Sequence, residues 1–405
     1  MKQRNIILLV IVASLGYFVD IYDLIIYNIV KKTSLADIGI TGDLFKQNET
    51  YLFNVQMTGM LLGGLLWGIL GDKKGRLKVL FGSILMYSIA NIANAYVVNI
   101  SQYAICRFIA GIGLAGELGA GITLVVEIMD KKNRGYGTMI IVTFGALGAV
   151  AAYIISSIAG WQSAYITGGV MGLLLLAMRI GISESGMYKG LQESDVKRGD
   201  FMMLVNNPKR LIKYLACICI GLPVWYVVGI LINLGEHFAA MKVIDGDAIV
   251  TGKCVLYAYL GLSVGDLLSG ILSQVMKSRR KVVIIYLAFI SVTVLYYIFT
   301  PRMTTTHFYM VCLLLGASTG FWALFVTIAS EQFGTNLRST VTNTVPNFVR
   351  GAVVIITISF TSLKTSIGIN QAALVVGAVC IGLSLISVLY VKETFSQDLN
   401  YFEIE

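Results

Sequence analysis

The 405-residue chain has few charged side chains and only two histidines. Asp, Glu, Lys and Arg make up 13% of its residues, whereas a soluble domain carries about 25%. The histidines, His237 and His307, do not form a nucleophile–base or metal-binding set, and the P-loop pattern G-x-x-x-x-G-K-[ST] does not occur. The sequence therefore predicts neither an enzyme nor an ATP-driven pump, and it predicts no cofactor and no metal site.

Cysteine is also scarce. The six cysteines fall within or at the edges of apolar blocks, without a C-x-x-C spacing, at Cys106, Cys217, Cys219, Cys254, Cys312 and Cys380. We interpret them as reduced packing residues, not as metal ligands or disulfide partners.

Apolar residues dominate what is present. They make up 57% of the chain and come in blocks of about 20 residues, the length that crosses a bilayer as a helix. The predicted spans are 6–30, 51–71, 79–98, 101–129, 136–159, 163–183, 212–238, 253–276, 282–300, 307–331, 340–363 and 370–391. The first block is too long for a signal peptide, so we expect it to be retained as the first helix.

The sequence thus predicts an all-α membrane protein with twelve transmembrane helices in two six-helix bundles. The longest polar stretch separates six spans from six. We expect an N-terminal bundle over 1–183, a cytoplasmic linker over 184–211, a C-terminal bundle over 212–392 and a cytoplasmic tail over 393–405.

The net charge of +9 reflects the loops between spans. Lys and Arg are about three times as frequent in the loops on one side as on the other, and the richer side is expected to be cytoplasmic. No basic domain interleaved with aromatic residues occurs, which argues against nucleic acid as a partner. We expect a bilayer-embedded monomer in the bacterial inner membrane, with both termini in the cytoplasm.

The two halves repeat one another. Gly64–Leu70 resembles Asp266–Leu272, and the pair Glu127 and Arg134 recurs as Glu331 and Arg338, each about 200 residues later. Two matches at nearly one offset predict two similar halves with the substrate path between them.

One loop carries a family resemblance. Gly71-Asp72-Lys73-Lys74-Gly75-Arg76, with Gly68 before it, resembles the hallmark loop of the major facilitator superfamily. The second copy of the loop is degraded, because Gln274 stands where aspartate is expected and only Arg279 and Arg280 remain. The resemblance implies a secondary transporter that works by alternating access.

Two further motifs resemble particular branches of that superfamily. Asp20-Ile21-Tyr22-Asp23 is similar to the first helix of phosphate:proton symporters, and Arg107–Gly113 with Gly116-Glu117 is similar to the fourth helix of metabolite:proton symporters and sugar porters. The resemblance implies proton-coupled uptake of a small polar metabolite. A sugar-like uniporter or symporter stays an alternative, as do an efflux exporter, with less support, and a channel, which saturable flux and counterflow would exclude.

Charged residues inside spans are expected to line the path. Asp20 and Asp23 share one helical face, with Tyr27 one turn further, and their depth matches that of Arg107. We therefore expect an Asp23–Arg107 interaction that couples proton binding to transport, or else a static pair that orients two helices. Glu117 is either a second proton or substrate site or a hydrogen-bond partner of a neighbouring helix.

Six charged residues lie at the cytoplasmic ends of spans: Asp72, Arg76, Glu127, Arg134, Glu331 and Arg338. Resemblance to sugar porters implies that they form salt bridges closing a cytoplasmic gate. Simple surface pairing is the alternative.

The second half has no charge at the positions equivalent to Asp23, Arg107 and Glu117, so we expect it to supply much of the substrate site. Candidates, together with Tyr27 in the first half, are Trp225, Tyr226, Asn233, Asp266, Trp322, Asn347 and Arg350. Arg350 lies deep within its span and requires an anion or a carboxylate partner, for which Asp266 is a candidate. With two intramembrane arginines in the chain, an organic or inorganic anion is the preferred substrate.

Overall fold

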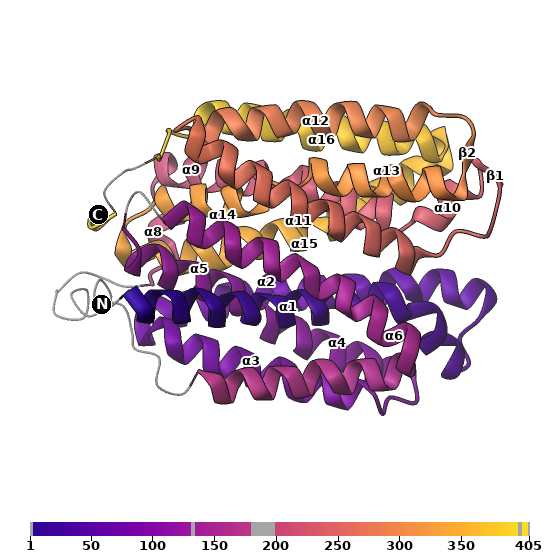
Figure 1. Cartoon of the computed structure of the whole chain (residues 1–405), viewed down its shortest axis with the longest axis horizontal. Helices are drawn as coiled ribbons and strands as arrows, with labels where there is room; N and C mark the ends of the chain where they lie inside the picture. Colours follow the sequence, from indigo (N-terminus) through magenta and orange to yellow (C-terminus); the bar gives the residue numbers. More distant parts are fainter. Residues whose placement is uncertain (1–2, 131–133, 180–198, 396–398, 404–405) are drawn as a thin grey trace.

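The computed structural model describes residues 3–130, 134–179, 199–395 and 399–403. Most of these residues are helical, and the long helices run roughly side by side (Figure 1). The predicted linker over 184–211 falls largely on 180–198, outside the described residues.

The first half of the chain supplies six helices. They are α1 (Gln3–Asp37), α2 (Gly42–Lys74), α3 (Arg76–Asn94), α4 (Ile100–Leu114), α5 (Glu117–Ile128) and α6 (Arg134–Met178). The second half supplies α8 (Met202–Val205), α9 (Pro208–Tyr226), the π-helix η1 (Val227–Ile232), α10 (Gly235–Ala239), α11 (Thr251–Val275), α12 (Arg279–Phe299), α13 (Thr305–Ser318), α14 (Trp322–Glu331), α15 (Thr335–Ile367) and α16 (Ile369–Tyr390). Two short parallel strands, β1 (Val243–Asp245) and β2 (Met303–Thr304), join the loops after α10 and α12.

The described residues contain eleven helices long and apolar enough to cross a membrane. One of them, α6, has 45 residues and is interrupted at Gly160, whose φ of 79° is open to glycine but strained for other residues. The predicted fifth and sixth spans are therefore two arms that meet at a single glycine. With that break the count is twelve, as predicted.

Two spans are interrupted at corresponding positions. The fourth consists of α4 and α5, which meet at Ala115 and Gly116, and the tenth consists of α13 and α14, which meet at 319–321. At Gly320 a Cβ atom would lie 2.3 Å from the backbone of Gly265, so only glycine permits this approach to α11. Paired interruptions in the two halves mark the region of a binding site in transporter folds.

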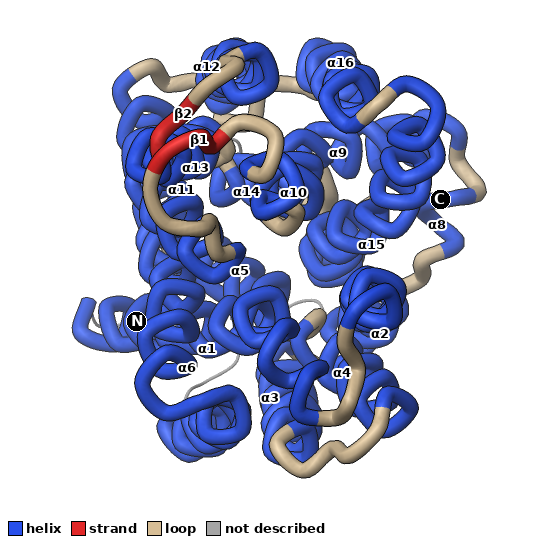
Figure 2. Tube along the Cα trace, turned by 90° about the vertical axis from the view of Figure 1, so that its right-hand side faces the viewer, coloured by secondary structure: helices blue, strands red, loops and turns tan. Residues whose placement is uncertain are grey.

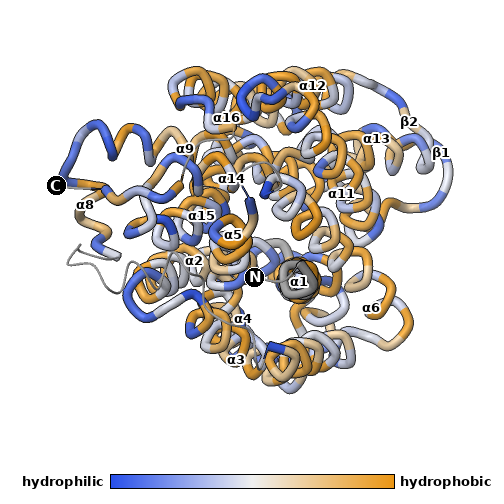
Figure 3. The backbone as a smooth tube through the Cα atoms, turned by 60° about the vertical axis from the view of Figure 1, so that its left-hand side comes forward, coloured by the Kyte–Doolittle hydropathy of each residue, from blue (hydrophilic) through white to orange (hydrophobic). Residues whose placement is uncertain are grey.

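The halves lie side by side. Helices α1–α6 occupy the lower part of Figure 1 and α9–α16 the upper part, and the view along the helices keeps the same division (Figure 2). Helix α15 packs on α2 and α5 across the boundary, and α11 packs on α1 and α6. In Figure 3 the helices are mostly hydrophobic, and the hydrophilic residues lie mainly in loops and near the C-terminus.

Outward-facing positions are apolar and inward-facing ones are partly polar. Ile158, Val292 and Ile355 are 65–80% exposed on the outer surface, as expected for contact with lipid tails. In contrast, the first turns of α15, from Thr335 to Asn347, are buried although most of their side chains are polar. The polar interior of the molecule is thus the boundary between the halves.

Candidate functional site

Arg350 of α15 occupies the centre of that boundary. Its guanidinium lies beside an edge-to-face pair of indole rings, 5.9 Å from the centroid of Trp225 and 5.8 Å from that of Trp322, and these two centroids are 6.4 Å apart. Nη1 donates to Oδ1 of Asn347 at 3.2 Å. A buried cation flanked by aromatic faces is stabilised by cation–π attraction and keeps donors free for an anion.

The other half of the molecule supplies the carboxylate nearest to Arg350. Oδ2 of Asp20 in α1 lies 3.8 Å from Nη2, and the hydroxyl of Tyr17 lies 3.5 Å from the same nitrogen. Among the described residues, neither oxygen of Asp20 nor Nε of Arg350 has a hydrogen-bond partner. The Arg350–Asp20 pair is therefore loose and crosses between the halves.

Asp266, the predicted partner of Arg350, is bound elsewhere. Its Oδ1 accepts a hydrogen bond of 3.0 Å from the backbone N–H of Ala323, in the first turn of α14. A carboxylate at that place satisfies the free donors of a helix N-terminus. The predicted Asp266–Arg350 pairing was wrong. Asp266 instead accepts a hydrogen bond at the start of α14, directly after the interruption between α13 and α14.

A cavity of about 20 Å³ lies beside Arg350, space for about one water molecule. The side chains around it are otherwise mainly apolar or aromatic: Tyr17, Ile21, Val142, Ala146, Val224, Trp225, Val228, Tyr259, Leu262 and Trp322. Nε1 of Trp322 is buried without an acceptor. The lining comes from both halves, so any larger ligand requires the halves to move apart.

Arg107 of α4 contacts neutral side chains. Nη2 donates to Oδ1 of Asn91 at 2.5 Å and Nη1 to Oε1 of Gln56 at 3.5 Å, while the guanidinium lies 4.8 Å from the ring centroid of Tyr165. Both oxygens of Asp23 are buried without a hydrogen-bond partner. Within the described residues Asp23 forms no ion pair with Arg107, although Arg107 is the opposite charge that acts most strongly on it.

The expected direct Asp23–Arg107 contact is thus replaced by Asn91 and Gln56. Sequence reasoning missed these two residues, although amides inside apolar spans are a usable signal. Asn91 and Gln56 accept from the arginine, while the Asp23 carboxylate, which is just as deeply buried, keeps its own desolvation cost.

Glu117 forms a bidentate ion pair with Arg179, which follows α6. Nη1 of Arg179 lies 3.0 Å from Oε2, and Nη2 contacts Oε1. Both side chains are almost fully buried. This contact matches the expectation of a bond to a neighbouring helix and adds Arg179, which the sequence did not single out as a partner.

The six expected gate residues meet at one end of the boundary. Glu127 binds Arg76 at 2.9 Å and Arg338 at 3.4 Å. Glu331 binds Arg134 at 2.7 Å and Arg279 at 2.7 Å. Each glutamate thus holds one arginine of its own half and one of the other. These side chains are 0–2% exposed, so the alternative of surface pairing was wrong.

Asp72 adds a contact across the same boundary. It accepts hydrogen bonds from the N–H groups of Ser339 and Thr340 at 3.1 and 2.8 Å, and from the Thr340 hydroxyl at 2.7 Å. Gln274, which stands at the equivalent position in the second half, packs against the first half: a Cβ on Gly135 would lie 2.0 Å from its Nε2. The degraded second loop thus still contacts the other half, and its ion pair is formed by Arg279.

The chain end covers this gate. Nη2 of Arg338 donates to the carbonyl of Leu399 at 2.6 Å, and the N–H of Thr335 donates to the carbonyl of Tyr401 at 2.9 Å. Leu399 is 1% exposed. The described tail residues therefore stabilise the closed arrangement at this end.

The opposite end has a smaller contact between the halves. Nζ of Lys31 lies 2.8 Å from Glu49 and 3.3 Å from both the carbonyl and the side-chain oxygen of Asn233. Tyr27 donates to the carbonyl of Glu49 at 2.9 Å. Asn233 and Tyr27, expected at the substrate site, thus lie at this outer contact and do not line the cavity at Arg350.

Tyr226 also lies away from that cavity. Its hydroxyl donates to the carbonyl of Ala373 in α16 at 2.7 Å. Since Tyr226 follows Trp225 directly, a helix points the two side chains about 100° apart, and only one can face the boundary. The residues expected at the substrate site that do meet are Trp225, Trp322, Asn347 and Arg350.

Comparison with known proteins agrees with this architecture. The family model of the Major Facilitator Superfamily matches residues 13–357. A solved structure of the proton:xylose symporter XylE superposes with a TM-score of 0.80 over 99% of this chain and 98% of that one, at 13% identity. The fold is that of a polytopic helical membrane transporter. The chain belongs to the Major Facilitator Superfamily, and the predicted fold class is confirmed.

Relatives with related sequences are transporters and not enzymes. A Bacillus subtilis protein named for niacin/nicotinamide transport is 32% identical over 184 residues, 44% of this chain and 45% of that protein. A Cupriavidus pinatubonensis protein named for 4-methylmuconolactone transport is 25% identical over 335 residues, 80% of this chain and 76% of that one. The printed names of these relatives describe transporters of small metabolites, and this chain spans less than half the length of the first of them.

Proposed function

We propose that this protein takes up a small organic anion, a ring-bearing monocarboxylate, together with a proton, by alternating access. The observation that carries the proposal is Arg350, buried beside the Trp225–Trp322 pair and only loosely paired with Asp20. The names of the relatives agree, since niacin is an aromatic carboxylic acid and 4-methylmuconolactone is a ring with a carboxylate arm.

The chemistry of the site fits such a substrate. A carboxylate would bind the guanidinium through two parallel hydrogen bonds, and the nitrogens Nη2 and Nε face few competing acceptors. The indole rings would stack on a planar ring, as aromatic pairs do at 4.5–7 Å. Asn347 orients the guanidinium through its 3.2 Å contact with Nη1.

Proton coupling would follow from competition for Arg350. An ionised Asp20 occupies the arginine, and a substrate carboxylate cannot share it without strong repulsion. When Asp20 binds a proton, Arg350 becomes free for the substrate, so proton and anion load together. Asp23 with Arg107, and Glu117 with Arg179, would relay or tune this step from the N-terminal half.

The gates would alternate access to the site. The cytoplasmic gate is the set formed by Asp72, Arg76, Glu127, Arg134, Arg279, Glu331 and Arg338, and the outer contact is Lys31 with Glu49 and Asn233. We propose the bundle limits 1–183 and 212–392, both termini in the cytoplasm, the bacterial inner membrane as location, and a monomer as the working unit.

Solute flux into liposomes tests the proposal. Purified protein would be assayed for counterflow and for uptake driven by an imposed pH gradient, with nicotinate and benzoate as carboxylates, nicotinamide as the neutral analogue and xylose as the sugar. We expect the carboxylates to accumulate against their gradient only when the outside is acidic. Transport of xylose with no carboxylate flux would favour the sugar-transport alternative and overturn the proposal.

A further inference from the structure

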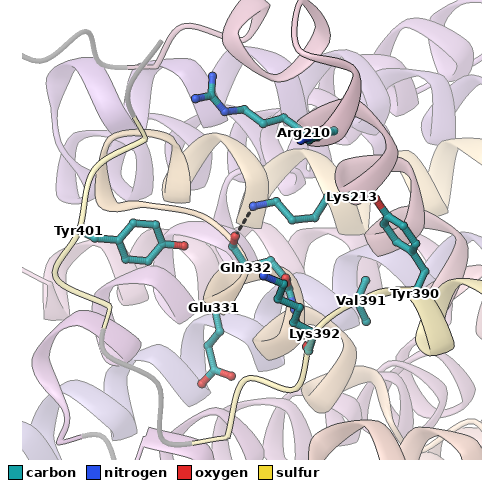
Figure 4. Close-up of a pocket in the computed structure, with 9 residues that line it drawn as sticks. Arg210, Lys213, Glu331, Gln332, Tyr390, Val391, Lys392 and Tyr401 are labelled. Carbon is teal, nitrogen blue, oxygen red and sulfur yellow. Dashed lines mark hydrogen bonds between the residues drawn. The ribbon is translucent and has the colours of Figure 1, made fainter.

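A basic pocket lies at the cytoplasmic ends of α9 and α16, away from the substrate site (Figure 4). Its volume is about 630 Å³, and four cationic side chains line it: Lys209, Arg210, Lys213 and Lys392. The mechanism proposed above uses none of these four residues.

The pocket carries excess positive charge. Its one acidic lining residue, Glu331, is already bound by Arg134 and Arg279. Arg210 and Lys213 both contact the carboxylate of Glu403, at 3.2 and 3.5 Å. The ammonium groups of Lys209 and Lys392 have no hydrogen bond or ion pair with any residue in the described part of the chain.

The pocket also lies at the edge of the apolar surface. The span of α9 begins at Pro208 and that of α16 ends at Tyr390, so the basic residues lie within about one turn of the span ends. On the same two helices Ile212, Leu215 and Leu389, which do not line the pocket, are 51%, 48% and 56% exposed. A cationic pocket at the end of helices with exposed apolar side chains is complementary to a phosphate group that carries acyl chains.

We propose that this pocket binds a phosphate group, that of an anionic phospholipid headgroup. Lys209 and Lys392 would contact the phosphate oxygens from both sides, with Arg210 behind them, and the acyl chains would run along Ile212, Leu215 and Leu389. Basic residues at the cytoplasmic face contribute about a factor of five in lipid affinity each. The site is independent of the transported substrate.

Thermal unfolding in a neutral detergent tests the site, with phosphatidylglycerol, phosphatidylcholine and inorganic phosphate as probes. We expect phosphatidylglycerol to raise the Tm of the wild type, while phosphatidylcholine and millimolar phosphate leave it unchanged. The double variant Lys209→Gln/Lys392→Gln should need about 25-fold more phosphatidylglycerol for half of the shift. Lys74→Gln/Lys78→Gln, which removes two exposed lysines from the other half, should respond like the wild type.

Equal responses of the two double variants to phosphatidylglycerol would overturn the proposal, as would a phosphatidylcholine effect of the same size. A full shift by inorganic phosphate alone would assign the pocket to a soluble anion and contradict the lipid. Loss of the lipid effect in Lys209→Gln/Lys392→Gln alone would support the site whether or not the transport proposal holds.

Discussion

At the scale of single residues, the account depends on one buried cation. Arg350 lies at lipid depth among aromatic rings, and its nearest carboxylate is 3.8 Å away. A fully buried charge is tolerated only with partners, and a loose pair leaves hydrogen-bonding capacity for a ligand. Depth alone identified Arg350 in the sequence.

Replacing this cation should weaken carboxylate binding. We expect Arg350→Gln to weaken binding of nicotinate or benzoate about 10- to 100-fold, because one hydrogen-bonded charged contact contributes about 1.5–3 kcal/mol. Titration calorimetry on the purified protein would measure it. Arg302→Gln, at an exposed loop position, is the matched control, and equal affinities in the two variants would exclude Arg350 from the site.

Asp23 should matter for coupling but not for binding. Its carboxylate is buried without hydrogen bonds, so Asp23→Asn preserves its shape while removing the ionisable group. We expect counterflow to persist and pH-driven accumulation to fall to the equilibrium ratio. Undiminished uphill accumulation by this variant in proteoliposomes would rule out a coupling role.

Glu393 links stability to pH outside the membrane. Burial raises the pKa of Glu393, but hydrogen bonds from Ser278 and from the N–H groups of Arg279, Phe395 and Arg280 outweigh it, so the pKa lies below the ordinary value. A lowered carboxyl pKa stabilises the fold above the unfolded-state pKa, and the effect is lost as pH falls through the folded-state value.

We therefore expect Glu393→Gln to lower the Tm by about 1–2 °C at pH 7. The difference should shrink once the pH falls below about 4, where the wild-type carboxyl also binds a proton. Thermal unfolding in detergent at several pH values would measure it. A Tm difference that grows toward acid pH would show that the sign is wrong.

At the scale of helices, close approach between the halves depends on glycine. A Cβ on Gly68 of α2 would lie 3.0 Å from the Cα of Thr340 in α15, and a Cβ on Gly119 of α5 would lie 2.6 Å from the Cα of Asn343. Helices pack this closely only where side chains are absent. These contacts bring Asp72 within reach of the α15 backbone.

A larger side chain at Gly68 should separate α2 from α15. We expect Gly68→Leu to destabilise the closed cytoplasmic end, so that amide hydrogens in the first turns of α15 exchange roughly tenfold faster. Gly382→Leu is the control, because nothing lies within 4 Å of a Cβ there. Unchanged exchange in Gly68→Leu, measured by mass spectrometry, would contradict the packing argument.

The helices were predictable where apolar runs are long. Twelve spans follow from the composition, and even the sharp turn within α6 falls at Gly160, between two predicted spans. The interruptions after α4 and α13 were not predicted, although each falls at a glycine with a polar neighbour, at Gly116-Glu117 and at Thr319-Gly320. Pro223 lies within α9, shortly before the π-helix η1, and a proline inside a helix favours such an irregularity.

At the scale of the whole molecule, the ion pairs at one end of the boundary follow the internal repeat of the sequence. Glu127 and Glu331 occupy equivalent positions, and each binds an arginine from either half. The repeat in the sequence indicated which residues correspond, although not that the pairs would cross. Partner choice elsewhere also escaped prediction. A rise of about 1.5 Å per residue gives the depth of Asp20, Asp23 and Asp266 but not the direction in which each faces.

Alternating access would require the contacts at the two ends to open in turn while the site at Arg350 stays between them. One end is closed by buried ion pairs and the other by Lys31 with Glu49, and the cavity between them has room for about one water. Loading a substrate must therefore separate the halves at one end. Breaking a buried pair costs about 3–5 kcal/mol, so binding energy and new partners must offset that cost.

The most direct test is the pH change that accompanies transport. Carboxylate would be added to lightly buffered proteoliposomes while the external pH is recorded. The account predicts an immediate alkalinisation with the wild type and none with Asp20→Asn, whose Arg350 is permanently free. Wild-type carboxylate flux without any pH change, or an equal pH change with Asp20→Asn, would contradict the claim that proton and anion share Arg350.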